Sequence, residues 1–374
     1  PVLGSIGPGT DTLKTDEGTP VKSIYVSDSS TSDIESLFQG KNKDDGRIET
    51  DKSVMYGKDD YSIFNSYNPG EFSVMLSALG QKYIDTTSGI IHVPLDVVLV
   101  LDISGSMSVD GDGKRADNLV KAVNKTITYL MKEDENNRVA VVAYNTKATK
   151  ILPLGRYYVG SKADYSNTNS YFSVSKSSKN DGYKKLDIGK IKNESTNNLT
   201  DKASKSIEVY GATYIQDGIK QGADILINEK TTTYTDSVSG QKVTRTPNIL
   251  LLSDGCPTLG NSDYKNLPSN KKFGDGSCCG SENTTDNNKE YSENDKGIFG
   301  YYTILTAKYY KDSVSKHYNG QEDHKNNKFF TVGVGVTEGE DYDYISQVLH
   351  PTAQNLERCK NSKDPRANEL HKAL

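Results

Sequence analysis

A carboxylate and two hydroxyls, spaced two residues apart, follow the most aliphatic run of the sequence. Asp102, Ser104 and Ser106 come directly after residues 95–101 (LDVVLVL). Such a run of aliphatic and β-branched residues is typical of a central parallel strand that is covered on both faces. Because ligands of open α/β sheets bind beyond the carboxyl ends of the strands, we expect these three side chains at the functional edge of a sheet.

Two further oxygen-bearing side chains are expected at the same edge. Thr213 comes just before a helical stretch, and Asp254 follows a second buried run, residues 248–253 (NILLLS). The combined set offers only hard oxygen ligands, which select Mg²⁺, Mn²⁺ or Ca²⁺ over Zn²⁺ or copper. We therefore predict a divalent metal site. The alternative is that the D-x-S-x-S segment only caps the helix after the strand, because Asp and Ser are common capping residues.

The elements that position these residues alternate along the chain. Further strand-like runs lie at 138–144, 148–154 and 329–336, and apolar residues recur at helical spacing over 119–131, 215–226 and 304–310. This alternation predicts an α/β fold with a doubly wound, mostly parallel sheet flanked by helices.

Changes in composition divide the chain into three parts. We expect an irregular leader at 1–50, a partial β-domain at 51–92, and the α/β domain at 93–374 with polar insertions at about 155–205, 230–246 and 257–300. The leader is rich in Gly, Ser, Thr and Asp, and the β-domain contains short runs in partial alternation.

Composition and charge exclude several classes of protein. The longest strongly apolar stretches are about ten residues, short of the roughly 20 that a membrane-spanning helix needs. The 45 basic and 50 acidic residues are intermixed, which leaves no broad basic field for nucleic acid or anionic lipid. We therefore expect neither nucleic-acid binding nor direct membrane insertion.

The sequence offers no set of residues for catalysis. Its five histidines form neither an H-E-x-x-H motif nor a pair at i, i+4 spacing, and no G-x-S-x-G segment is present. Residues 110–114 (DGDGK) begin like a calcium loop, but Lys121 stands where the bidentate Glu is required. We predict that the protein is not an enzyme, and we interpret this loop as a polar neighbour of the metal edge.

The D-x-S-x-S pattern, the later Thr and the strand-end Asp resemble the metal-ion-dependent adhesion site of von Willebrand factor A domains and integrin I domains. Segments 211–218 (GATYIQDG) and 251–255 (LLSDG) follow in the order of that family, and the resemblance covers residues 93–374. It implies a ligand set in which hydroxyls bind directly and carboxylates bind directly or through water: Ser104, Ser106 and Thr213, with Asp102 and Asp254.

A site of this kind suits docking. Neutral hydroxyls donate little charge, so an ion held largely by them stays electrophilic and keeps one position for water. A carboxylate from a partner can take that position. The predicted function is therefore binding through Mg²⁺, or Mn²⁺ or Ca²⁺, with an acidic side chain of a partner protein as the docking group.

Long insertions around the metal resemble those of Gram-positive pilus tip and other surface adhesins, whose A domain is spliced into a β-sandwich. Residues 52–83 are similar to the part of that β-sandwich that precedes the A domain. Lys52 in this segment is a candidate for an isopeptide bond, with a solvated lysine as the alternative. The resemblance implies a secreted, cell-surface or cell-wall-anchored adhesin that binds host matrix or a host receptor. A structural or assembly module of a pilus, in which the metal only stabilises the fold or a subunit contact, is the alternative.

The four cysteines suggest disulfides, because an even count is typical of exported proteins. They are Cys256, Cys278, Cys279 and Cys359. A bond within the adjacent doublet would need a strained ring, so we favour Cys256 and Cys359 each pairing with one member of it. Free buried thiols are the alternative, and the lack of a C-x-x-C pair makes a zinc site the weaker interpretation.

Two insertions are candidates for selecting the partner. Segment 257–300 leaves the strand that carries Asp254, so it is expected at the metal edge, with a disordered polar loop as the alternative. Segment 155–205 contains five tyrosines, which offer contact area at low entropic cost. It is either a second recognition arm or a plain solvated excursion.

Overall fold

A computed structural model of the 374-residue chain gives the fold. It describes residues 93–109, 114–237, 239–268, 272–274, 297–320, 328–336 and 342–374, and the backbone of short strands outside these ranges. The chain divides into two compact units, Pro1–His92 with Asp236–Gln241, and Val93–Thr235 with Lys242–Leu374.

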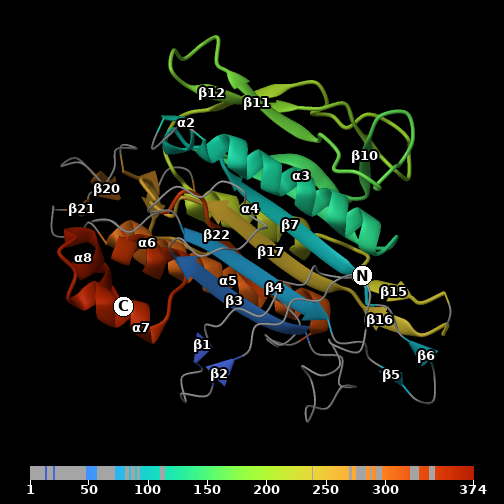
Figure 1. The fold of residues 1–374 in the computed structure, drawn as a ribbon. Coiled ribbons are helices and arrows are strands. Elements are labelled where there is room, and N and C mark those ends of the chain that lie inside the picture. Colours follow the sequence, from blue (N-terminus) through green and yellow to red (C-terminus); the bar gives the residue numbers. More distant parts are fainter. Residues whose placement is uncertain are drawn as a thin grey trace. The chain divides into compact units, whose positions relative to one another are not determined.

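A five-stranded sheet forms the centre of the second unit (Figure 1). Its strands in spatial order are β22 (Lys328–Gly333), β17 (Thr246–Ser253), β7 (Leu95–Asp102), β8 (Arg138–Tyr144) and β9 (Ala148–Gly155). The first four are parallel, and β9 runs antiparallel to β8. The predicted α/β fold with a mostly parallel sheet is confirmed.

Helices cover both faces of this sheet. Val97, Leu99 and Leu101 of β7 pack in one core with α3, whereas Val98 and Val100 pack in a second core with α4, α5, α6 and α8. The alternation along β7 explains why its whole aliphatic run is buried. The helices are α2 (Ser106–Val109), α3 (Arg115–Glu133), α4 (Ile215–Ile227), α5 (Ile298–Asn319), α6 (Tyr342–Leu349), α7 (Ala353–Lys360) and α8 (Pro365–Ala373). No described helix is both long and apolar enough to span a membrane.

The insertion at 155–205 is folded, which argues against the alternative of a plain solvated excursion. Tyr157, Tyr171 and Phe172 are buried in the α3 core. The Asn124 amide of α3 donates to the Phe172 carbonyl at 2.8 Å and accepts from the Phe172 N–H at 2.9 Å. The insertion and the residues after it form β10 (Tyr157–Val159), β11 (Phe172–Lys176), β12 (Lys184–Ile188), β13 (Ile191–Asn193) and β14 (Ser206–Val209).

Two elements of the sheet domain differ from the predicted extent. The strand predicted over 329–336 ends at Gly333, and its residues are half-buried because β22 is an edge strand. The helix predicted over 304–310 is longer, since Thr303, Thr306 and Tyr318 complete its buried face. A search for aliphatic residues alone misses such a face.

The remaining strands are short or lie outside the sheet domain. Within the insertions they are β15 (Thr233–Thr235), β16 (Lys242–Thr244), β18 (Gly260–Asn261), β19 (Lys272–Phe273), β20 (Thr284–Asp286) and β21 (Lys289–Tyr291). In the first unit they are β1 (Leu13–Lys14), β2 (Pro20–Val21), β3 (Ile48–Tyr56), β4 (Phe72–Gly80), β5 (Ile84–Asp85) and β6 (Gly89–Ile90). The antiparallel pair of β3 and β4 contains two of the predicted short runs. Lys52 belongs to β3, but its side chain lies outside the described residues.

Candidate metal centre

The D-x-S-x-S segment forms the turn between β7 and α2. Asp102 is the last residue of β7 and is fully buried, and its Oδ1 accepts a hydrogen bond from the Ser104 N–H at 2.9 Å. Ser106 is the first residue of α2. Both serines therefore leave the sheet at the carboxyl end of its central strand, as the sequence predicts. Residues 110–113 of the neighbouring DGDGK loop lie outside the described residues.

Residues from the adjacent strands hold the Asp102 carboxylate. Its Oδ2 accepts hydrogen bonds from the Tyr144 hydroxyl at 2.9 Å and the Ser253 hydroxyl at 2.7 Å. Tyr144 ends β8 and Ser253 ends β17. Neither residue is among those predicted from the sequence, although each is the polar end of a buried run that leads to the same sheet edge.

A hydrogen-bonded chain joins Ser104 to Asp254, which lies 150 residues later in the sequence. The Ser104 and Ser106 hydroxyl oxygens are 3.1 Å apart, and the Ser106 hydroxyl donates to Oδ2 of Asp254. Asp254 follows β17 and is buried. The structure therefore brings four of the five predicted ligands into one continuous group.

The fifth predicted ligand, Thr213, lies in an adjoining loop. The Gly105 N–H donates to the Gly211 carbonyl at 2.9 Å, which places the loop before α4 beside the serine turn. The Thr213 N–H donates to the Thr258 hydroxyl at 2.8 Å, and the Thr258 N–H returns a bond to the Thr213 carbonyl at 3.0 Å. Thr213 is thus buried in a loop whose backbone is fixed at the edge of the site.

The electrostatics of the site suit a cation. Burial, and then the nearby charge of Asp254, raise the pKa of Asp102 from 3.8 to about 7. Burial and the Asp102 charge also raise the pKa of the Tyr144 phenol well above 10. Two buried carboxylates beside serine hydroxyls make a hard oxygen donor set, which fits a divalent ion such as Mg²⁺. Within the described ranges, no group of three or more His, Cys, Asp or Glu side chains is placed to hold a metal ion.

Arg115 is a third residue at this edge that the sequence did not predict. Its Nη1 lies 3.4 Å from Oδ2 of Asp254, and its Nη2 donates to the Gly335 carbonyl at 3.1 Å. The guanidinium thus supplies positive charge next to the carboxylate. No short motif marks this role, because Arg115 is simply the first residue of α3.

Replacing Gly218 by Ala will weaken both the fold and the site. A Cβ at this position of α4 would lie 2.5 Å from Cδ1 of Tyr144 and 3.0 Å from Cγ1 of Val100. The Tyr144 ring, which bonds to Asp102, must then move. We expect the free energy of unfolding in urea to fall by about 1–3 kcal/mol. We also expect Mg²⁺ to raise the melting temperature by less than it does in the unmodified chain. Gln221→Ala on the same helix should change the unfolding free energy by less than about 0.5 kcal/mol. Equal effects of the two substitutions would contradict this packing.

The predicted disulfide of Cys359 is not formed. Its thiol is free and buried, and Sγ donates to the Asp343 carbonyl at 3.3 Å. Burial raises the pKa of this thiol to about 11, which keeps it protonated at neutral pH. The physical reason is that Cys359 lies in the last turn of α7 and packs in the core on the α4 face of the sheet. Cys278 and Cys279 lie outside the described residues, and the Cys256 Sγ accepts a hydrogen bond from Arg366 at 2.9 Å.

Comparisons with known proteins identify the family that this domain resembles. Residues 96–269 match the family model described as the von Willebrand factor type A domain, which confirms the family resemblance. The pilus adhesin SpaC from Lactobacillus rhamnosus GG is 16% identical with a TM-score of 0.38, and the match covers 87% of this chain and 33% of that one. PilB minor pilin from Streptococcus sanguinis is 12% identical with a TM-score of 0.33, covering 92% and 85%. The chain thus spans about a third of the SpaC structure. No curated protein matches it.

Proposed function

Because the chain contains a von Willebrand factor type A domain, we propose that it is a cell-surface adhesin that binds a protein partner through a divalent cation. Mg²⁺ is the proposed ion, with Mn²⁺ or Ca²⁺ as substitutes. The proposed ligands are Asp102, Ser104, Ser106, Thr213 and Asp254. The protein acts by binding and is not an enzyme.

The contact between Ser106 and Asp254 carries this proposal. It joins two strand-end segments into one oxygen-lined group, and Ser104 extends that group toward Asp102. When bound, the cation supplies a Lewis-acidic position for an incoming carboxylate. The hydrogen bonds from Tyr144 and Ser253 hold the Asp102 carboxylate in one orientation, as partners behind a ligating group would do.

The proposed partner presents an Asp or Glu side chain on an extracellular protein. A host matrix protein or cell-surface receptor fits a secreted, wall-anchored or pilus tip adhesin. The support is the family and the chemistry of the site: a hydroxyl-rich ligand set leaves the ion electrophilic toward a carboxylate.

Binding to a panel of immobilised matrix proteins tests the proposal. We expect binding in Mg²⁺ that EDTA abolishes and that Asp102→Ala weakens at least about tenfold, since removing groups around a bound metal typically costs 10–100-fold. Asp224→Ala is a matched control, because this carboxylate pairs with Lys220 on α4 outside the site. Binding that is indifferent to EDTA and to Asp102→Ala would overturn metal-dependent docking.

A pilus assembly module is the second candidate function. The burial of Asp102 and Asp254 favours it, because a cation between buried carboxylates would stabilise the fold even without a host ligand. In that case Mg²⁺ would raise the melting temperature, no matrix protein would be retained, and purified surface subunits would bind instead.

A further inference from the structure

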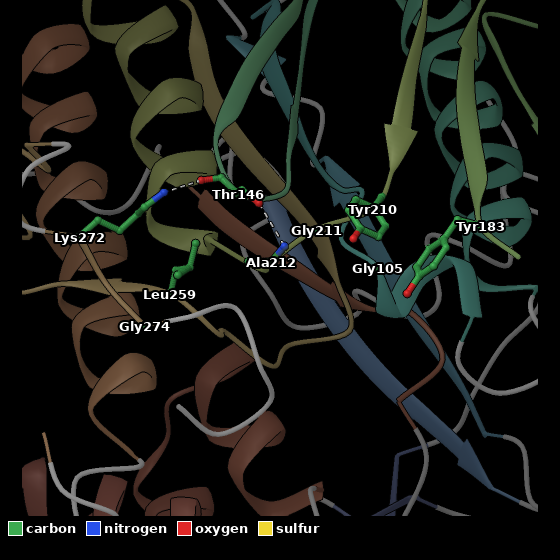
Figure 2. Close-up of a pocket in the computed structure, with 9 residues that line it drawn as sticks. All are labelled: Gly105, Thr146, Tyr183, Tyr210, Gly211, Ala212, Leu259, Lys272 and Gly274. Atoms are coloured by element: carbon green, nitrogen blue, oxygen red, sulfur yellow. Dashed lines mark hydrogen bonds between the residues drawn. The ribbon is translucent and has the colours of Figure 1, made fainter. Parts of the chain in front are cut away.

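A cavity of about 460 Å³ borders the serine turn. It is lined by Gly105, Thr146, Tyr183, Tyr210, Gly211, Ala212, Leu259, Lys272 and Gly274 (Figure 2). Gly105 lies between Ser104 and Ser106, so the cavity begins where the candidate metal site ends.

Two insertions supply opposite walls of the cavity. Figure 2 shows Tyr183 and Tyr210 on one side of the glycine-rich floor and Lys272 on the other. The tyrosine rings meet edge to face with centroids 4.8 Å apart, and Tyr210 is 45% exposed. Three other tyrosines of insertion 155–205 are buried in the core, so Tyr183 is the one that reaches this cavity.

The floor is made of backbone that has little room for side chains. Gly211 has a φ of +98°, and a Cβ there would lie 2.8 Å from the Thr146 hydroxyl oxygen. That hydroxyl accepts a hydrogen bond from the Ala212 N–H at 3.2 Å. A partner segment can therefore approach the chain closely along Gly105 and Gly211.

Lys272 gives the cavity its charge. Among the nine described lining residues, it has the one charged side chain. Its ammonium group donates to the Thr146 carbonyl at 3.1 Å and lies over the Tyr214 ring, 5.4 Å from the centroid. These contacts fix its position, and an ammonium group has three donors, so it can also bind a negative group in the cavity.

We propose that this cavity binds residues flanking the docking carboxylate and that Lys272 selects a second acidic side chain two or three residues away. This inference rests on the proposed function, because the first carboxylate must sit on the cation. The partner is an acidic, extended protein segment. A polyanionic glycan is the poorer fit, since one lysine makes no broad basic field.

A peptide array tests the inference. Immobilised nine-residue peptides carry a central Asp with varied flanking residues, and the full chain is applied in Mg²⁺ or EDTA. We expect peptides with a second Asp or Glu two or three positions away to bind about threefold better than neutral ones, in line with a single partly exposed ion pair. Lys272→Met should remove this preference and keep Mg²⁺-dependent binding, and Lys272→Glu should reverse it in favour of Lys or Arg.

Matched variants separate the outcomes. Lys150→Met removes a lysine of β9 that lines a different cavity, so it should leave the preference for a second acid unchanged. Tyr210→Ala should weaken the binding of every peptide that binds in Mg²⁺, whatever its flanking residues. If Lys272→Met binds the same peptides with the same preference as the unmodified chain, and binding still depends on Mg²⁺, this inference is overturned while the proposed function stands. Loss of peptide binding on adding heparin, with no preference for a second acid, would favour a glycan and overturn it too. Peptide binding that never depends on Mg²⁺ would overturn the proposed function as well.

Discussion

The metal-free protein will lose thermal stability as the pH is raised from 5 to 8, and Mg²⁺ will restore most of the loss. Asp102 causes this, since its pKa is about 7 in the folded chain against an ordinary value of 3.8. Well below pH 3.8 the carboxyl is protonated in both the folded and the unfolded state and contributes nothing. Between pH 4 and 7 the unfolded chain releases the proton while the folded chain retains it, so stability falls.

The size of this effect makes it measurable. At about 1.4 kcal/mol per pKa unit, the roughly two units between pH 5 and a folded pKa of about 7 correspond to a loss on the order of 3 kcal/mol. For a unit of this size, this is roughly 5–10 °C in melting temperature. A divalent cation needs the ionised carboxylate, so metal binding displaces the proton and the gain from Mg²⁺ grows with pH.

Melting curves in EDTA and in Mg²⁺ at several pH values provide the measurement. Asp102→Asn is the control, because its amide cannot ionise and every other titratable group of the chain is retained. Its melting temperature in EDTA should not show the fall with rising pH that ionisation of Asp102 causes. Mg²⁺ should no longer raise its melting temperature. Parallel pH profiles for the Asn variant and the unmodified chain in EDTA would contradict the assigned role of Asp102.

Asp96→Ala will destabilise the α/β unit by about 3–5 kcal/mol, the usual cost of breaking a buried ion pair. Asp96 is fully buried and accepts hydrogen bonds from Arg138 at 2.6 and 2.8 Å. It also accepts from Arg245 Nε at 2.9 Å and from the Tyr318 hydroxyl at 2.7 Å. Removing the carboxylate leaves Arg245, itself buried, without this compensating charge.

Urea denaturation followed by circular dichroism measures this loss. Glu229→Ala is the matched control, because Glu229 lies 3.3 Å from Arg138 but is partly exposed. Its removal should cost about 0–1 kcal/mol, as for other exposed pairs. A cost below about 1 kcal/mol for Asp96→Ala would show that the network at the start of β7 contributes little to the fold.

Local pattern was sufficient for the elements that bear the site. The aliphatic run before Asp102 and the one before Asp254 predicted two buried strands of one mostly parallel sheet, and the structure pairs them directly as β7 and β17. Parallel neighbours bring their carboxyl ends to one edge, so residues 150 positions apart could be placed together from sequence. The spacing of Asp102, Ser104 and Ser106 is local and needed no tertiary information.

Packing decided what pattern could not. From the sequence, Tyr157, Tyr171 and Tyr183 are equal candidates for a binding surface, because all three are tyrosines of the same insertion. In the structure, Tyr157 and Tyr171 pack against α3, and of the three only Tyr183 reaches the cavity. The free thiol of Cys359 likewise follows from where α7 packs. Side-chain identity alone does not encode which of several similar residues meets a core.

The sequence by itself determined the α/β fold, the oxygen donors of the candidate metal site and the sheet edge that holds them, because strand periodicity and parallel topology are local rules with a fixed geometric outcome. Only the tertiary structure decided that Tyr144 and Ser253 hold Asp102, that Arg115 lies beside Asp254, and that Lys272 lies across a cavity from Tyr210. These contacts join segments separated by tens to more than a hundred residues through loops and insertions. No periodicity fixes the path of such segments, so their side chains meet only once the chain has folded.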